Sequence, residues 1–155
     1  MSTSDRPSGL TALAVINFIF GFVQLIASLV FPYRRFVGAP REVERGMPKE
    51  EAFADKIVAL LELTPPQAIW NTFYLFATGA LLILAGVGYL RRSRRLGLRL
   101  TTIYVGIEVL GLVLALTWMP ESYLRQMGVA VIRMAFFPLF LGVVIHTVFR
   151  RDFVR

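Results

Sequence analysis

The sequence of 155 residues contains no cysteine and one histidine, His146. Without cysteine, the chain cannot form a disulfide scaffold, a thiol redox centre or a thiolate metal site. A single histidine also excludes a histidine metal cluster within one chain. The sequence also contains no nucleophile motif, P-loop or dinucleotide fingerprint. Gly86-Val87-Gly88 is not a phosphate-binding loop, because it lies inside an apolar run and not at the start of a helix. We therefore expect no catalytic residue, no cofactor and no metal.

Charged residues are scarce in four long stretches of the chain. Hydrophobic residues make up 56% of the sequence, against roughly 45–50% apolar residues in soluble domains. The first stretch, Leu10–Phe31, carries no charge and would span about 33 Å as a helix, enough for a hydrocarbon core of about 30 Å. It is too long for the apolar region of a cleaved signal peptide, about 7–15 residues. The four stretches predict an all-α polytopic membrane protein, a single domain over residues 1–155 with an antiparallel bundle of four transmembrane helices at about 10–31, 68–90, 100–118 and 129–149.

The longest connection, residues 32–67, differs in composition from the helices around it. Its basic and acidic residues balance. Within it, residues 48–63 have a helical pattern, with Phe53, Ile57, Leu60 and Leu61 on one face. Since this segment is too short and too charged to span a membrane, we expect an amphipathic helix that lies on the outer membrane surface or caps the bundle.

The segment Leu90–Arg99 contains five arginines and no acid. A short basic turn between two apolar runs is typical of the cytoplasmic side of a membrane protein. With four spans, this places both termini in the cytoplasm, although Arg34 and Arg35 follow the first run directly and argue for the opposite orientation. We interpret the net charge of +7 as contact with anionic lipid and not with nucleic acid. The candidate lipid contacts are Arg91, Arg92, Arg94, Arg95 and Arg99.

Three short segments at helix boundaries are typical of one group of proteins. They are Arg6–Thr11 leading into the first helix, Gly88–Arg92 at the end of the second, and Arg150–Phe153 at the close of the last. Together they give a sequence that resembles a broad group of small, uncharacterised bacterial four-helix integral membrane proteins. The resemblance implies a location in the bacterial inner membrane. It implies no activity.

Each predicted helix carries small or polar residues at a spacing of seven. Seven residues are close to two helical turns, so each set lies on one face. Helices in lipid associate through close backbone approach and hydrogen bonds, which favour such residues at contacts. We expect these faces to pack within the bundle or against a second protomer. The four sets are Ala14, Gly21 and Ser28; Thr72, Gly79 and Gly86; Thr101, Glu108 and Ala115; Gly128, Ala135 and Gly142.

Glu108 is the acid nearest the middle of a predicted span. A carboxylate at that depth must be paired, hydrated or protonated, and intramembrane acids are candidate functional residues. Arg133, in the next helix, could reach Glu108, extend to the outer surface or contact a neighbouring subunit. The sequence leaves these three arrangements open.

Asn17 and Gln24 lie on one face of the first helix, with Gly21 between them. Their amides could form hydrogen bonds between helices, or they could line a hydrated cavity. His146 lies near the basic C-terminal tail and fits an interfacial hydrogen-bonding role.

These features support two main hypotheses. The first is a structural or accessory membrane protein that associates with itself, as a homo-oligomer, or docks on another membrane protein. The second is a small channel or transporter for ions, protons or small solutes that uses Glu108, Arg133, Asn17 and Gln24. A membrane enzyme acting on lipid is a third and weaker alternative.

Overall fold

The computed structural model describes residues 8–153, with the side chains of residues 8, 129–131, 133, 134 and 152 outside this description. Every regular element among the described residues is a helix. Three segments, Gly9–Glu44, Pro65–Leu90 and Arg94–Trp118, are long and apolar enough to cross a membrane. The elements are α1 (Ser8–Tyr33), η1 (Arg34–Gly38), α2 (Ala39–Glu44), α3 (Glu51–Glu62), α4 (Pro65–Leu90), η2 (Arg94–Arg99), α5 (Leu100–Trp118), α6 (Glu121–Gln126), α7 (Gly128–Thr147) and η3 (Arg150–Asp152).

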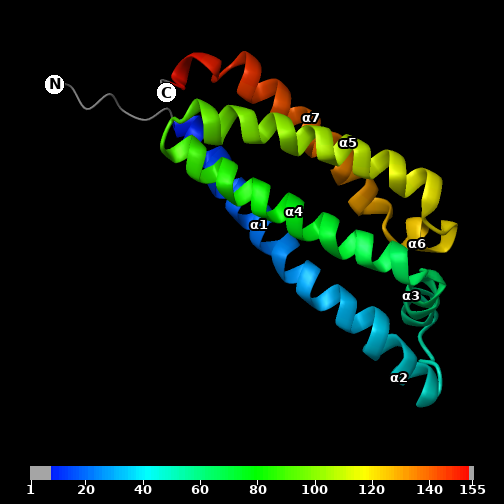
Figure 1. Cartoon of the computed structure of the whole chain (residues 1–155). Helices are drawn as coiled ribbons and strands as arrows, with labels where there is room; N and C mark the ends of the chain where they lie inside the picture. The colour runs from blue at the N-terminus through cyan, green and yellow to red at the C-terminus, as the bar shows by residue number, and fades with distance from the viewer. Residues whose placement is uncertain (1–7, 154–155) are drawn as a thin grey trace.

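The long helices lie side by side (Figure 1). α1 packs mainly on α4, and α5 packs on both α4 and α7. One end of the structure carries the turn Arg91–Arg99, and we call it the arginine end. The other carries α3 and α6, which pack on each other, and we call it the α3 end. The start of α1 and the last described residues both lie at the arginine end.

Three of the expected helices have nearly the observed bounds. The second, expected at 68–90, is α4 and begins at Pro65. The third coincides with α5, and the fourth corresponds to α7, which continues through Pro138. The first does not end near Phe31 but passes Pro32 and continues through the wider π-helical turn η1 into α2. Residues 51–62 form α3, inside the stretch 48–63 for which the sequence pattern predicted a helix.

Arg35 connects the turn after this proline to the end of α3. Its Nε donates to the carbonyl of Leu63 over 3.1 Å, and its Nη2 donates to the carbonyl of Leu61 over 3.2 Å. These carbonyls lie at the end of α3, where backbone acceptors have no partner within the helix. One of the two arginines that argued against the proposed orientation thus has a structural role.

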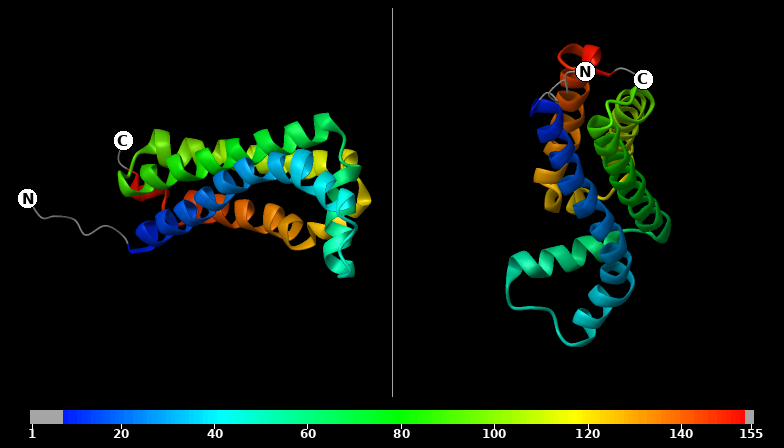
Figure 2. Two further views of the ribbon diagram at one scale, coloured as in Figure 1. Left: turned by 90° about the horizontal axis from the view of Figure 1, so that it is seen from below. Right: turned by 90° about the vertical axis from the view of Figure 1, so that its left-hand side faces the viewer.

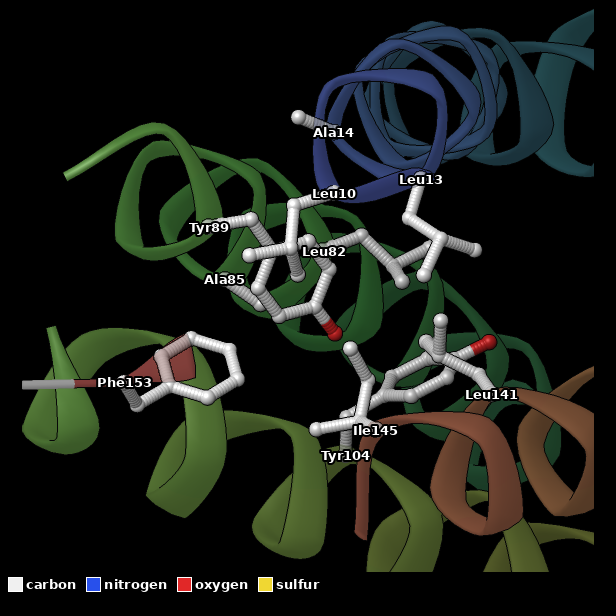
Figure 3. Packing of buried hydrophobic residues seen from close by; sticks show 10 residues of the cluster. All are labelled: Leu10, Leu13, Ala14, Leu82, Ala85, Tyr89, Tyr104, Leu141, Ile145 and Phe153. Carbon is white, nitrogen blue, oxygen red and sulfur yellow. The ribbon is translucent and has the colours of Figure 1, made fainter. Parts of the chain in front are cut away.

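The main hydrophobic cluster lies toward the arginine end (Figure 3). Its members come from α1, α4, α5 and α7 and are almost fully buried. Phe153, near the C-terminus, completes it by packing edge to face against Tyr89 with ring centroids 6.0 Å apart. The cluster closes this end of the helices. Its buried residues are Leu10, Leu13, Ala14, Leu82, Ala85, Tyr89, Tyr104, Leu141, Ile145 and Phe153.

Two glycines allow the tight turn at the arginine end. A side chain at Gly88 would collide with the backbone of Gly97, and one at Gly97 would collide with the ring of Phe153. Arg92 takes a left-handed conformation with φ of 54°. Arg94 Nε donates to the Phe153 carbonyl over 3.2 Å. The chain therefore reverses direction within a few residues and is held by its C-terminal segment.

Candidate functional site

The face of α1 that carries Asn17, Gly21, Gln24 and Ser28 is buried. A Cβ at Gly21 would lie 2.9 Å from the carbonyl oxygen of Gly79, and a Cβ at Gly79 would lie the same distance from the carbonyl oxygen of Gly21. The expected polar and small face of the first helix therefore forms the contact between α1 and α4.

Gly86 and Gly142 also pack within the chain, whereas Gly128 is exposed. Gly86 lies against the ring of Phe18, and a Cβ at Gly142 would be 3.2 Å from the Val105 side chain. Small residues thus permit close helix approach inside one chain, as expected for helices in lipid.

Glu108 is buried, with 1% of its surface exposed. The hydroxyl of Tyr74 on α4 donates a hydrogen bond to Glu108 Oε2. Gly111, one turn further along α5, makes room for this tyrosine, because a Cβ there would overlap the Tyr74 ring. The acid faces α4, inside the chain. A hydrogen bond to a buried carboxyl offsets part of the cost of removing it from water.

The side chain of Arg133 lies outside the described residues. The three arrangements considered for Arg133 therefore stay open. Among the described side chains, Tyr74 of α4 donates a hydrogen bond to Glu108.

Asn17 lies deep in the packing and is fully buried. The hydroxyl of Tyr89 lies near its amide, but neither amide atom has a hydrogen bond of acceptable geometry. Tyr89 instead pairs with the hydroxyl of Thr101 over 2.5 Å, and Thr101 donates to the Gly97 carbonyl over 2.6 Å. Asn17 thus lies beside the hydrogen bond between Tyr89 and Thr101, which links α4 to the start of α5. It lines none of the described pockets.

Gln24 lines a groove at the α3 end with a volume of about 740 Å³. We call it the Gln24–Asn71 groove. Its walls come from α1, η1, α4, α6 and the start of α7, and they include Val23, Ala27, Arg34, Leu75 and Arg125. The carbonyl oxygen of the Gln24 side chain and the side-chain amide nitrogen of Asn71 are buried, and neither has a hydrogen bond of acceptable geometry with a described residue.

Tyr123 on α6 forms part of the same groove. Burial raises the pKa of this phenol above its ordinary value, and interaction with the Asn71 side chain offsets part of the rise. The phenol therefore stays protonated over the physiological pH range and remains able to donate a hydrogen bond.

Three polar residues of α4 share a buried face that leads inward from this groove. They are Asn71, Tyr74 and Thr78, spaced three and four residues apart. Thr78 donates to the Tyr74 carbonyl over 2.8 Å, and Tyr74 contacts Glu108. Our sequence reasoning missed Tyr74 and Asn71. The helical spacing of these residues was the available signal.

The remaining candidates lie at the arginine end. Arg91, Arg94, Arg95 and Arg99 are exposed, and Arg92 is half-buried. The His146 ring hydrogen-bonds with the Gly142 carbonyl over 2.9 Å and with the Thr102 hydroxyl over 3.2 Å. Within the described part of the chain, no three His, Cys, Asp or Glu residues lie close enough together to hold a metal ion.

Comparison with protein-family models, with curated proteins and with solved structures finds no match to this chain. The resemblance to small bacterial membrane proteins therefore stays a prediction. The candidate sites must be interpreted from their own geometry.

Proposed function

We propose that the chain crosses the bacterial inner membrane four times, as an antiparallel bundle with both termini in the cytoplasm. α7 contains 20 residues and would span about 30 Å. The described ends of the chain lie together at the arginine end, which supports an even number of crossings. Reporter domains fused after Arg155 and inserted near Glu44 should report opposite sides of the membrane. The same side for both would overturn the proposal.

We propose further that the protein is an accessory membrane subunit that binds other subunits, or a second copy of itself, through a protruding lobe. The observation that carries this proposal is the length of the first helical segment, Gly9–Glu44, with 36 residues. Such a segment is about 54 Å long, whereas the hydrocarbon core is about 30 Å thick. Figure 2 shows α2 and α3 extending beyond the packed helices.

The lobe, formed by residues 39–62, has an apolar surface of its own. Its exposed apolar side chains are Val43, Met47, Phe53 and Val58. Of the face expected on α3, Ile57 is buried but Phe53 is 46% exposed. Exposed apolar groups outside a hydrocarbon region mark interaction surfaces. This lobe would contact a partner that presents an apolar patch at the same height above the membrane.

The absence of native cysteine makes this docking proposal simple to test. Single cysteines placed at Val43, Met47 or Phe53 should form crosslinks in native membranes. The mass of each adduct would separate self-association from docking on another subunit. A cysteine at the lipid-facing Leu116, which is 59% exposed, is the control. If the lobe cysteines give no more adduct than Leu116→Cys, the lobe is not an interface.

One observation favours transport as a second candidate function. The polar face Asn71–Tyr74–Thr78 connects the Gln24–Asn71 groove with Glu108. A carboxyl at the inner end of a polar path could exchange a proton with a solute or an ion. In proteoliposomes, Glu108→Gln should then abolish solute-coupled proton movement while assembly stays normal. Equal proton movement in both proteins would refute this candidate.

A further inference from the structure

The Gln24–Asn71 groove holds polar groups with unused hydrogen-bonding capacity. The Gln24 side chain is 2% exposed and the Asn71 side chain 8% exposed. Among the described residues, Gln24 Oε1 meets no hydrogen-bond donor, and Asn71 Nδ2 lies near the Tyr123 side chain but has no hydrogen bond of acceptable geometry. Leaving such groups unpaired costs folding free energy. A ligand that supplies both missing partners would therefore recover interactions that the folded chain lacks.

The size of the groove fits a molecule larger than a few waters. Its volume of about 740 Å³ falls within the range of roughly 300–1,000 Å³ typical of ligand pockets. Ala27 and Leu75 form apolar walls. Val23 and Val30 also line it and are 53% and 38% exposed. The groove is thus open sideways along α1, on the apolar part of the helix that lipid would surround.

The mouth of the groove is positively charged. Arg34 lines it, is exposed and makes no ion pair with any residue that the structure describes. Arg125 is paired only with Glu121, and both of these side chains are almost fully exposed, so the pair offers little resistance to a competing anion. An anionic group at the mouth would gain a direct charge partner.

The free polar groups lie at two depths. Gly21 faces Gly79 in the antiparallel contact of α1 with α4, so Asn71 lies level with about Leu29. Gln24 is five residues further from the mouth, a distance of about 7–8 Å along the helix. A suitable ligand therefore has an acceptor near its anionic end and a hydrogen-bond donor several Å further inward.

We propose that the Gln24–Asn71 groove binds an anionic lysophospholipid, a phospholipid with a single acyl chain and a free glycerol hydroxyl. Arg34 and the Asn71 amide contact the phosphate. The glycerol hydroxyl donates to Gln24 Oε1, and the acyl chain leaves sideways past Val23 and Val30. This site is separate from the arginines at the opposite end of the molecule. It depends on neither the docking proposal nor the transport candidate.

The test uses the full-length chain in a nonionic detergent and titrates lysophosphatidic acid, with bound lipid counted by native mass spectrometry. Ala27→Phe places a ring in the groove and should lower the affinity at least tenfold. Ile26→Phe adds the same ring at the adjacent position, which is 61% exposed and outside the groove, and should bind as the unaltered chain does. If Ala27→Phe also binds normally, the groove is not the site.

Two further comparisons identify the ligand. Arg34→Gln should weaken binding about fivefold, the effect of one exposed ion pair, whereas Arg41→Gln, which removes an exposed arginine outside the groove, should leave it unchanged. Equal weakening by both would mean general surface attraction and would overturn the proposal. Glycerol phosphate, oleate and diacyl phosphatidic acid, which has no free glycerol hydroxyl, should each bind more weakly than the lysophospholipid. Equal or tighter binding of glycerol phosphate would identify a soluble ligand, and equal or tighter binding of oleate or the diacyl lipid would refute the role of the glycerol hydroxyl.

Discussion

The close contact between α1 and α4 at Gly21 gives a quantitative prediction. A Cβ at this position would lie 2.7 Å from the Ile83 side chain and 2.9 Å from the Gly79 carbonyl oxygen. The second neighbour is backbone, so Gly21→Ala can be accommodated only if the two helices move apart. Overpacking of this kind costs about 1–3 kcal/mol. The variant should therefore lose stability through the helix contact.

Gly106 provides the matched control. It lies within α5, and a Cβ there would meet no atom of the described side chains or backbone within 4 Å. Alanine favours a helix over glycine by about 1 kcal/mol at either position, so this gain cancels when the two variants are compared. Gly21→Ala should be less stable than Gly106→Ala by about 1–3 kcal/mol.

Equilibrium unfolding in mixed micelles, followed by far-ultraviolet circular dichroism, measures this difference. Shortening the neighbour with Ile83→Ala in the Gly21→Ala background should recover part of the loss, because one of the two clashes is relieved. If Gly21→Ala is as stable as Gly106→Ala, the helices are not in backbone contact at Gly21 and the packing described above is incorrect.

Three other predictions concern the ends of the molecule. Arg35→Gln removes the hydrogen bonds to the end of α3, so limited proteolysis should cut residues 46–64 faster than in the unaltered chain. Burial raises the pKa of Tyr123. The contribution of the Tyr123 phenol to the free energy of unfolding is therefore complete below the ordinary tyrosine pKa of about 10 and is lost as the pH rises above that value. Tyr123→Phe should flatten this alkaline decline in unfolding titrations. Phe153→Ala removes a buried ring from the turn at Gly97 and should cost about 3 kcal/mol in the same assay, and an unchanged midpoint would contradict its packing role.

The local features of the helices could be predicted well. Long uncharged runs fix where helices occur, because a backbone in lipid must satisfy its own hydrogen bonds. Pro120 and the arginine turn gave the bounds of α5. The predicted end of the first helix near Phe31 was wrong, because a proline usually ends a helix. Here a wider turn follows Pro32, and Arg35 binds a segment 26 to 28 residues away. No local pattern encodes that contact.

For the polar residues too, the local arrangement could be predicted from the sequence but the contacts between helices could not. The spacing of Asn17, Gly21 and Gln24 was enough to predict that they share a face, because helical geometry is local. That Gln24 borders a groove while Asn17 is enclosed depended on how α1 packs against other helices. The partner of Glu108 was equally hidden, since Tyr74 lies 34 residues away.

The sequence by itself determined that this protein is helical and suited to a membrane, through hydrophobicity and charge that act on each segment separately. Only the tertiary structure decided which polar groups find partners, because hydrogen bonds require atoms of different helices to meet within about 3 Å. It paired Glu108 with Tyr74 and left Gln24 and Asn71 facing a groove.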